Sequence, residues 1–119
     1  MTAGSAQPQW PAAGKPVLLM TVTNAGTTAC TRDVGLSQQE WGIFDGQTRL
    51  WGSNDCQFEP GTDVRALQPG EQVTLQVQWT GMSSDPECAQ PRNRLTPGQY
   101  QLRAKIGPVQ SADFALILT

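Results

Sequence analysis

The sequence predicts an all-β domain, an antiparallel sandwich of about seven strands. Several segments alternate apolar and polar residues with a period of two, and none sustains a 3.6-residue period. Two prolyl-glycyl turns, Pro69-Gly70 and Pro97-Gly98, directly precede the two most regular segments. A length of 119 residues provides one hydrophobic core and not two, so we expect residues 1–119 to form a single domain.

The first two strands are expected at residues 2–9 and 16–24. The first ends before Pro11 and Gly14, which turn the chain. The second ends at Asn24-Ala-Gly. Next comes a hairpin: residues 38–44 and 47–51 flank Asp45-Gly46, a dipeptide that accommodates the positive φ angles of a tight turn.

Three more strands are expected at residues 72–79, 99–106 and 111–118. In each, every second residue is apolar, as expected where one face of a sheet is buried and the other meets water. Tyr100, close after Pro97, resembles the corner tyrosine of sandwich domains, whose hydroxyl bonds back to the chain. The predicted core is Leu18, Met20, Val22, Trp41, Ile43, Val73, Leu75, Val77, Trp79, Tyr100, Leu102, Ala104, Ile106, Phe114 and Leu116.

Two long connections remain, residues 52–69 and 80–96, and each holds a cysteine. Loops of this length in a compact domain are usually functional or need a covalent cross-link to hold them. The three cysteines, Cys30, Cys56 and Cys88, all lie beside turn-forming residues, as disulfide cysteines of exported domains commonly do. Three reduced cysteines in a cytosolic protein are the alternative.

Composition excludes several classes of function. A net charge of −2 and a pI near 4.9 argue against nucleic acid, which requires a basic face. The eight basic residues are scattered and apolar runs such as Val17 to Met20 are far shorter than a membrane span, so we expect no direct insertion into a membrane. Met1 followed by Thr-Ala-Gly-Ser-Ala suggests a domain excised from a longer exported or anchored protein, whose signal or anchor lies outside this sequence.

Catalytic groups and metal ligands are not recognisable. The chain has no histidine to serve as a base near neutral pH, and its carboxylates fall mostly in turns and loops. The cysteine spacings of 26 and 32 residues do not match metal-binding pairs. We therefore expect no enzyme activity, no cofactor and no metal.

The four tryptophans are the most distinctive side chains for packing or recognition. Trp41 and Trp79 share strand faces with core residues, and Trp51 is expected to pack over the edge of the sandwich. Trp10, near the start of the chain, is expected to be partly exposed. Arg32 and Asp33 are interpreted as a local ion pair of small energetic effect. The candidate interaction surface comprises Trp10, Arg32, Asp33, Arg92 and Arg94.

The order of these features resembles a known family. It runs from Val22-Thr-Asn24 through Asp45-Gly46 and Leu50-Trp51 to Leu67-Gln-Pro69-Gly70-Glu71, Trp79 and Pro97-Gly98-Gln-Tyr100. This series is similar to the BsuPI-type (intracellular proteinase inhibitor-like) family and to related immunoglobulin-like domains of bacterial envelope proteins. The resemblance implies an immunoglobulin-like sandwich with Greek-key connections over about residues 17–118.

The cysteine-bearing segments are more similar to exported actinobacterial envelope domains of unassigned function. These segments are Cys30-Thr-Arg-Asp33-Val-Gly35, Trp51-Gly-Ser-Asn-Asp-Cys56 and Cys88 after Trp79. Proteins of this kind often carry a fourth cysteine before the first strand, which would explain the odd count. In a Greek-key sandwich the loops holding Cys30 and Cys56 emerge at one end, so a Cys30–Cys56 disulfide is expected. Cys88 would then be free, or paired with a cysteine outside this sequence.

Together these observations favour a non-catalytic, extracytoplasmic interaction domain of a bacterial cell-envelope protein. It would bind an unidentified protein or wall component through its long loops or an exposed sheet edge. Two alternatives stay open: a proteinase inhibitor that presents residues 85–95 as a rigid loop, and a spacer domain without a ligand. The sequence does not indicate the oligomeric state.

Overall fold

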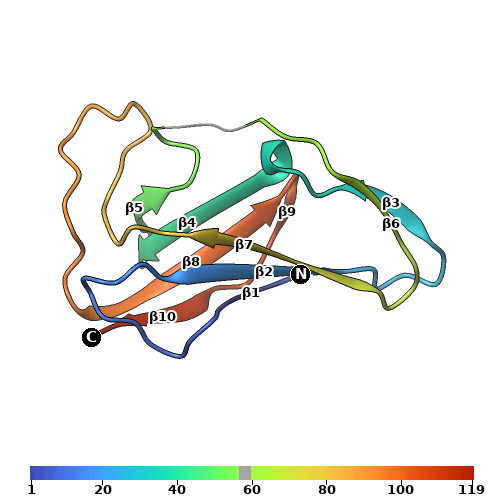
Figure 1. Ribbon diagram of the computed structural model, residues 1–119, viewed down its shortest axis with the longest axis horizontal. Helices are drawn as coiled ribbons and strands as arrows, with labels where there is room; N and C mark the ends of the chain where they lie inside the picture. Colours follow the sequence, from blue (N-terminus) through green and yellow to red (C-terminus); the bar gives the residue numbers. More distant parts are fainter. Residues whose placement is uncertain (57–59) are drawn as a thin grey trace.

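The computed structural model describes residues 1–56 and 60–119, which form ten strands and one short 3₁₀ turn (Figure 1). Within them, no helix has the length and apolar character to cross a membrane. The named strands pair antiparallel. The elements are β1 (Thr2–Ser5), β2 (Val17–Thr23), β3 (Cys30–Asp33), η1 (Leu36–Gln38), β4 (Gln39–Asp45), β5 (Thr48–Gly52), β6 (Val64–Leu67), β7 (Gln72–Gln78), β8 (Gly98–Ile106), β9 (Val109–Gln110) and β10 (Phe114–Leu118).

Two sheets enclose the core. One has the strand order β1-β2-β7, and the other has the order β10-β8-β4-β5 with β9 paired to β8. The predicted core residues are buried, except that Leu75, Val77 and Phe114 are partly buried and pack against the others. Leu18 and Met20 of β2 and Leu102 of β8 are fully shielded from solvent. Their burial in one cluster shows that the two sheets share a single core.

The turns predicted at Asp45-Gly46 and Pro69-Gly70 form as expected, whereas at Pro97-Gly98 the strand β8 already begins with Gly98. Gly46 adopts φ +62° between β4 and β5, which pair as a hairpin, and Gly70 adopts φ +80° before β7. Both angles lie in the left-handed region that glycine enters without strain. The Tyr100 hydroxyl donates a 2.6 Å hydrogen bond to the carbonyl of Thr96, which confirms the corner role.

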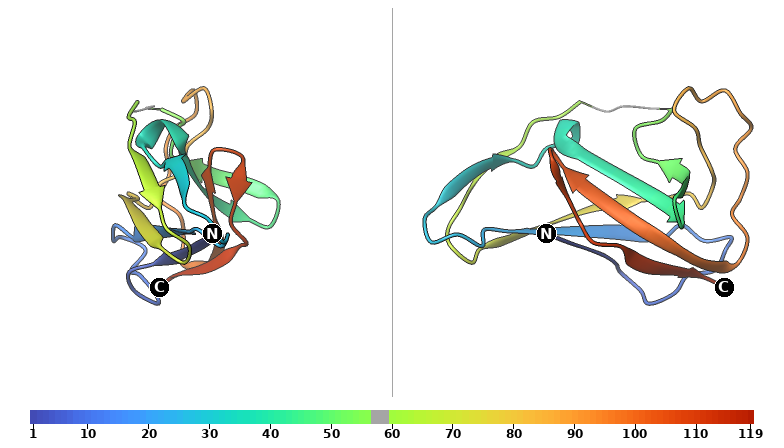
Figure 2. Two further views of the ribbon diagram at one scale, coloured as in Figure 1. Left: turned by 90° about the vertical axis from the view of Figure 1, so that its right-hand side faces the viewer. Right: turned by 180° about the vertical axis from the view of Figure 1, so that it is seen from behind.

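A two-stranded ladder that the sequence did not predict extends the molecule at one end. β3 and β6 pair from Cys30 opposite Leu67 to Asp33 opposite Val64, in stretches interpreted above as connections. We call residues 24–35 and 60–71 the arm; it is seen on the right in Figure 1, and Figure 2 shows it from the end and from behind. The four residues of β3 and of β6 are too few for an alternation of apolar and polar residues to be recognised. The two strands are also more than thirty residues apart in the sequence, so neither predicts the other.

Trp10 is buried, so the prediction that it is partly exposed is wrong. Only 8% of its surface is accessible, and it belongs to the core cluster. Its N–H donates to the carbonyl of Ile117 at 3.0 Å and its carbonyl accepts from the N–H of Thr119 at 2.8 Å. The segment after β1 thus covers the outer edge of β10, and this pairing holds the indole in the core.

Candidate binding cleft

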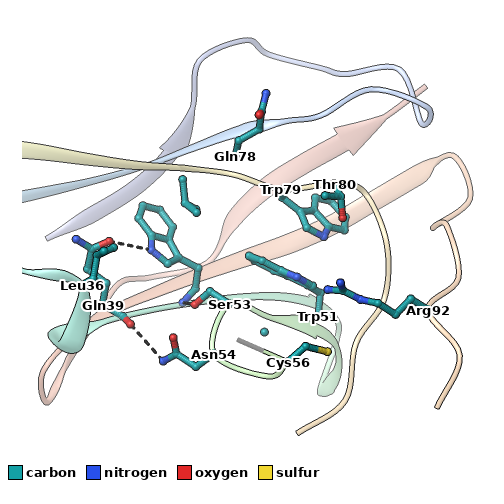
Figure 3. Close-up of a pocket in the computed structure, with 13 residues that line it drawn as sticks. Leu36, Gln39, Trp51, Ser53, Asn54, Cys56, Gln78, Trp79, Thr80 and Arg92 are labelled. Atoms are coloured by element: carbon teal, nitrogen blue, oxygen red, sulfur yellow. Dashed lines mark hydrogen bonds between the residues drawn. The ribbon is translucent and has the colours of Figure 1, made fainter. Parts of the chain in front are cut away.

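A cleft of about 300 Å³ opens where the end of β7 faces β4 and β5 (Figure 3). We call it the tryptophan cleft, because Trp41, Trp51 and Trp79 all contribute to its lining. Side chains from η1, from the segment after β5 and from the long loop after β7 complete it. Such a combination of aromatic rings with a few polar groups is typical of ligand sites.

A β-bulge in the hairpin directs Trp51 into this cleft. The register shifts between Ile43 and Phe44, so that Ile43 faces Trp51 while Phe44 faces Arg49. Leu50 is the extra residue, and the bulge turns the strand so that Trp51 shares the inner face with Ile43. Trp51 and Trp79 then lie with ring centroids 5.7 Å apart and planes tilted by 39°. The expectation that Trp51 only packs over an edge is therefore too coarse, because its side chain is 6% exposed and lines a cavity.

The three indole N–H groups are not equally satisfied. Trp41 Nε1 donates to Gln39 Oε1 at 3.3 Å, and Trp79 Nε1 donates to the carbonyl of Met82 at 3.0 Å. Trp51 Nε1 donates to no acceptor among the described residues, and, unlike Trp10 Nε1, it is not a buried atom, so it meets solvent in the cleft. When a ligand acceptor replaces water at such a donor, the net gain in free energy is about 0.5–1.5 kcal/mol. Of the three indole N–H groups lining the cleft, that of Trp51 is thus the one with no hydrogen bond to a described residue.

The polar lining is uncharged on one side and cationic on the other. Gln39 Nε2 donates to the carbonyl of Val34, and Asn54 Nδ2 donates to the carbonyl of Gln39. Both amides are therefore fixed in place. Arg92, from the long loop, is exposed and brings the positive charge. Among the described lining residues none is acidic, so the cleft suits a neutral or anionic group that accepts a hydrogen bond.

The disulfide next to the cleft joins Cys56 to Cys88, with Cα atoms 5.1 Å apart. The predicted Cys30–Cys56 pairing is wrong, and Cys88 is bonded within the domain. Cys30 begins β3 in the arm and is free and exposed. The prediction failed because the β3–β6 ladder carries Cys30 to the opposite end of the molecule, whereas the segments after β5 and β7 meet beside the cleft.

Side chains hold the same two segments together. Asp55 accepts two hydrogen bonds from Arg49, at 2.9 and 3.0 Å, and one from the Ser84 hydroxyl. The Ser84 N–H in turn donates to the carbonyl of Leu50 at 2.9 Å. The Asp55 side chain is 8% exposed and that of Arg49 28%, so the carboxylate is shielded from solvent while the guanidinium is partly exposed. It fixes the loop wall of the cleft against the edge of β5.

The candidate interaction residues do not gather on one surface. Trp10 is in the core, Arg32 and Asp33 lie on β3 in the arm, and Arg92 lines the cleft. Arg94 Nη1 donates to the carbonyls of Ala12 and Thr80, so it connects loops. Of the predicted set, only Arg92 belongs to the cleft; the open indole of Trp51 was missed because its orientation depends on the bulge.

The expected ion pair between Arg32 and Asp33 does not form. Asp33 Oδ1 accepts the N–H groups of Asp63 and Gly35, each at 2.9 Å. These two backbone hydrogen bonds, that of Asp63 first, lower the pKa of Asp33 from its ordinary value. The carboxylate therefore connects the two strands of the arm.

Residues 85–95 form an ordered loop. Asp85 accepts the N–H groups of Ala89 and Gln90 at 3.1 and 3.0 Å, and these bonds, that of Gln90 first, lower the pKa of Asp85. Cys88 adopts φ 54° inside the turn and is bonded to Cys56. Leu95 is buried at the far end. The loop is thus held at several points along its length.

Comparisons with known proteins give similarity of fold only. No family model matches the chain, and no curated protein matches it. A β-glucosidase from Erythrobacter marinus is similar in structure, with a TM-score of 0.56 and 13% identity over 100% of this chain and 15% of that one. A β-glucosidase from Listeria innocua gives a TM-score of 0.53 and 12% identity over 98% of this chain and 16% of that one. The chain spans about 15% of the length of these enzymes. The similarity therefore concerns the fold of this chain and a small part of each enzyme.

Proposed function

We propose that this chain is a non-catalytic interaction domain of a bacterial cell-envelope protein, with an immunoglobulin-like Greek-key sandwich fold. It works outside the cytoplasm and binds another protein or a wall component in the tryptophan cleft. The observation that carries this proposal is the open N–H of Trp51 in a cleft lined by two further tryptophans.

The chemistry of the cleft defines the ligand group. Aromatic rings contribute apolar contact area and lose little conformational entropy, because Trp41 and Trp79 are already fixed by hydrogen bonds. The Trp51 N–H requires an acceptor oxygen, and Arg92 favours a neutral or anionic ligand over a cationic one. A carbonyl or hydroxyl oxygen on an apolar body fits these requirements, and both peptides and saccharides carry such groups.

The Cys56–Cys88 disulfide supports a location outside the cytoplasm. Disulfides persist in oxidising environments outside the cytoplasm and are rare where thiol reductants are abundant. Because this disulfide lies beside the cleft, it also keeps the cleft wall in place before a ligand arrives, which reduces the entropy lost on binding.

Two matched indole substitutions test the proposal. Trp51→Phe removes the open N–H of the cleft, and Trp10→Phe removes an indole N–H that is buried without a partner elsewhere in the core. Each immobilised variant is incubated with an envelope extract, and bound proteins and glycans are identified by mass spectrometry. We expect a ligand retained by the wild type and Trp10→Phe, but reduced roughly 10-fold with Trp51→Phe, as for one lost hydrogen bond.

Recovery of no component above background by the folded wild type would contradict the proposal and favour a spacer domain. Equal recovery by both variants would show that binding does not use the cleft.

A second function, proteinase inhibition, is favoured by the ordered loop at residues 85–95. An inhibitory loop must be rigid, and here a disulfide and the Asp85 hydrogen bonds restrain it. Arg92 and Arg94 would then suit a trypsin-like specificity pocket. Inhibition assays against trypsin-like and subtilisin-like proteases test this function; with Arg92→Ala and Arg94→Ala the inhibition of trypsin should disappear. No inhibition at micromolar wild-type concentration would exclude it.

A further inference from the structure

The outer edge of β7 is an open sheet edge of seven residues. Within residues 1–56 and 60–119, β7 ends its sheet and pairs only with β2, in one continuous register from Gln72 to Gln78. The hydrogen bonds from the N–H of Trp79 to Pro16 and from the N–H of Asn24 to Glu71 lie at the two ends of this ladder. Because antiparallel strands alternate, the odd-numbered residues of β7 bond to β2. The backbone N–H and C=O groups of the even-numbered residues from 72 to 78 therefore point away from the sheet.

The other long edges are covered. Residues 10–12 pair with the edge of β10, and Ser84 bonds to Leu50 and Gly52 at the edge of β5. β7 has no charged residue, no proline and no bulge, which are the devices that usually block strand addition. Among the described residues, none pairs with this edge. It is thus a template for one more antiparallel strand.

Core-facing side chains are incompletely covered at the same edge. Leu75 and Val77 face the core, but both are partly exposed, whereas their β2 partners Met20 and Leu18 are fully shielded. None of the strands formed by the described residues covers them from beyond β7. An added strand with apolar residues at the same positions would bury this surface, and such burial drives association.

We propose that the occupant is a second copy of this chain, through antiparallel pairing of β7 with itself about a two-fold axis at Leu75. The strand reads Gln-Val-Thr-Leu-Gln-Val-Gln, which is nearly the same in both directions. Antiparallel self-pairing therefore places Val73 against Val77 of the second copy and Leu75 against its own counterpart. Of the polar residues, Gln72 faces Gln78 and Thr74 faces Gln76. No like charges meet, and the outward backbone groups of both strands are satisfied. The result is a six-stranded sheet with a closed two-fold interface.

The dimer itself needs no ligand, but Val77 and Gln78 of β7 also line the tryptophan cleft, so its formation is measured on the protein alone, without an envelope extract. Sedimentation of the intact chain over about 1 µM to 1 mM, a range that includes weak strand-mediated dimers, gives the dissociation constant. We expect a reversible monomer–dimer equilibrium. A chain that stays monomeric across the range would overturn the proposal and leave the edge to a different partner.

Proline at position 76 tests which edge is used. Gln76→Pro removes one outward N–H from each copy and no hydrogen bond to β2, whereas Gln76→Ala changes the side chain and keeps the N–H. Two lost ladder bonds should raise the dissociation constant by roughly 10- to 100-fold for Gln76→Pro. Gln76→Ala should stay close to the wild type. A Gln76→Pro protein with native tryptophan circular dichroism and unchanged dimerisation would contradict the use of β7.

A cysteine at position 75 tests the register. In a Cys30→Ser background, Leu75→Cys places two thiols across a non-hydrogen-bonded pair with Cα atoms about 4.5 Å apart, within disulfide range. Val73→Cys also faces the core, but the two copies of residue 73 are separated by four residues along the strands. Oxidation should therefore cross-link Leu75→Cys and not Val73→Cys. Equal cross-linking of the two variants would refute a two-fold axis at Leu75.

Discussion

The two ends of the molecule are built from long connections, yet they are held together by different means. In the arm, β3 and β6 form a backbone ladder, and Asn24 and Asp33 add side-chain bonds to backbone groups. At the tryptophan cleft, the segments after β5 and β7 are joined by the Cys56–Cys88 disulfide and by the Arg49–Asp55–Ser84 cluster.

This difference explains why the disulfide lies beside the cleft while the cysteine of the arm stays free. A ladder of repeated hydrogen bonds fixes the arm without a covalent link, and Cys30 remains free there. The segments beside the cleft make few backbone bonds to each other, so side chains and a disulfide supply the restraint. The cleft thereby gains an irregular wall, which can be shaped around a ligand.

Removal of the disulfide should have the largest effect on stability. In the double variant Cys56→Ser and Cys88→Ser, the unfolded chain is no longer restrained by a link over a sequence separation of 32 residues. We expect a loss of roughly 3–4 kcal/mol in the free energy of unfolding, measured by urea titration. A loss below about 1 kcal/mol would mean that the side-chain cluster alone holds this end.

Asn24→Ala should be the most costly single change in the arm. The Asn24 side chain is buried, donates to the carbonyls of Thr28 and Leu67 at 2.9 Å each, and accepts from the N–H of Gly26. We expect a loss of about 1–3 kcal/mol, because partner groups are left unsatisfied. Asn93→Ala, an exposed asparagine near the cleft, is the matched control and should change stability by less than about 0.5 kcal/mol.

Low pH should reduce the stability of both ends of the molecule, because it protonates Asp33 in the arm and Asp85 in the loop beside the cleft. Hydrogen bonds from backbone N–H groups lower both pKa values in the folded protein below the ordinary value of 3.8. The stability that these carboxylates contribute is therefore present above pH 3.8 and is lost as the pH falls through the lower, folded pKa values. NMR titration of the two carboxyl groups measures this directly. Folded-state pKa values at or above 3.8 would contradict the hydrogen bonding described here.

Cys30→Ser should have the smallest effect. Cys30 is exposed, and its thiol forms no disulfide within the domain. We expect the free energy of unfolding to change by less than about 0.5 kcal/mol. Thiol titration of the denatured protein without reductant should find one thiol in the wild type and none in this variant. Three thiols in the wild type would contradict the Cys56–Cys88 bond.

Local sequence determined the regular strands, their inward faces and the tight turns. In β7 and β8 the period-two pattern identifies the buried residues, because alternation is a local property of an extended chain. Asp45-Gly46 likewise specifies the hairpin through backbone geometry alone. These features require no knowledge of what lies on the other side of the core.

Tertiary structure alone decided the disulfide pairing, the arm and the open indole. Cys56 meets Cys88 because two loops that are distant in sequence end at the same place, and Cys30 is carried away by pairing of β3 with β6. Trp10 is buried because its backbone completes the edge of β10. Trp51 faces the cleft because a bulge changes the register by one residue. Each of these outcomes depends on contacts between distant segments, whose geometry is not encoded in the pattern of either segment by itself.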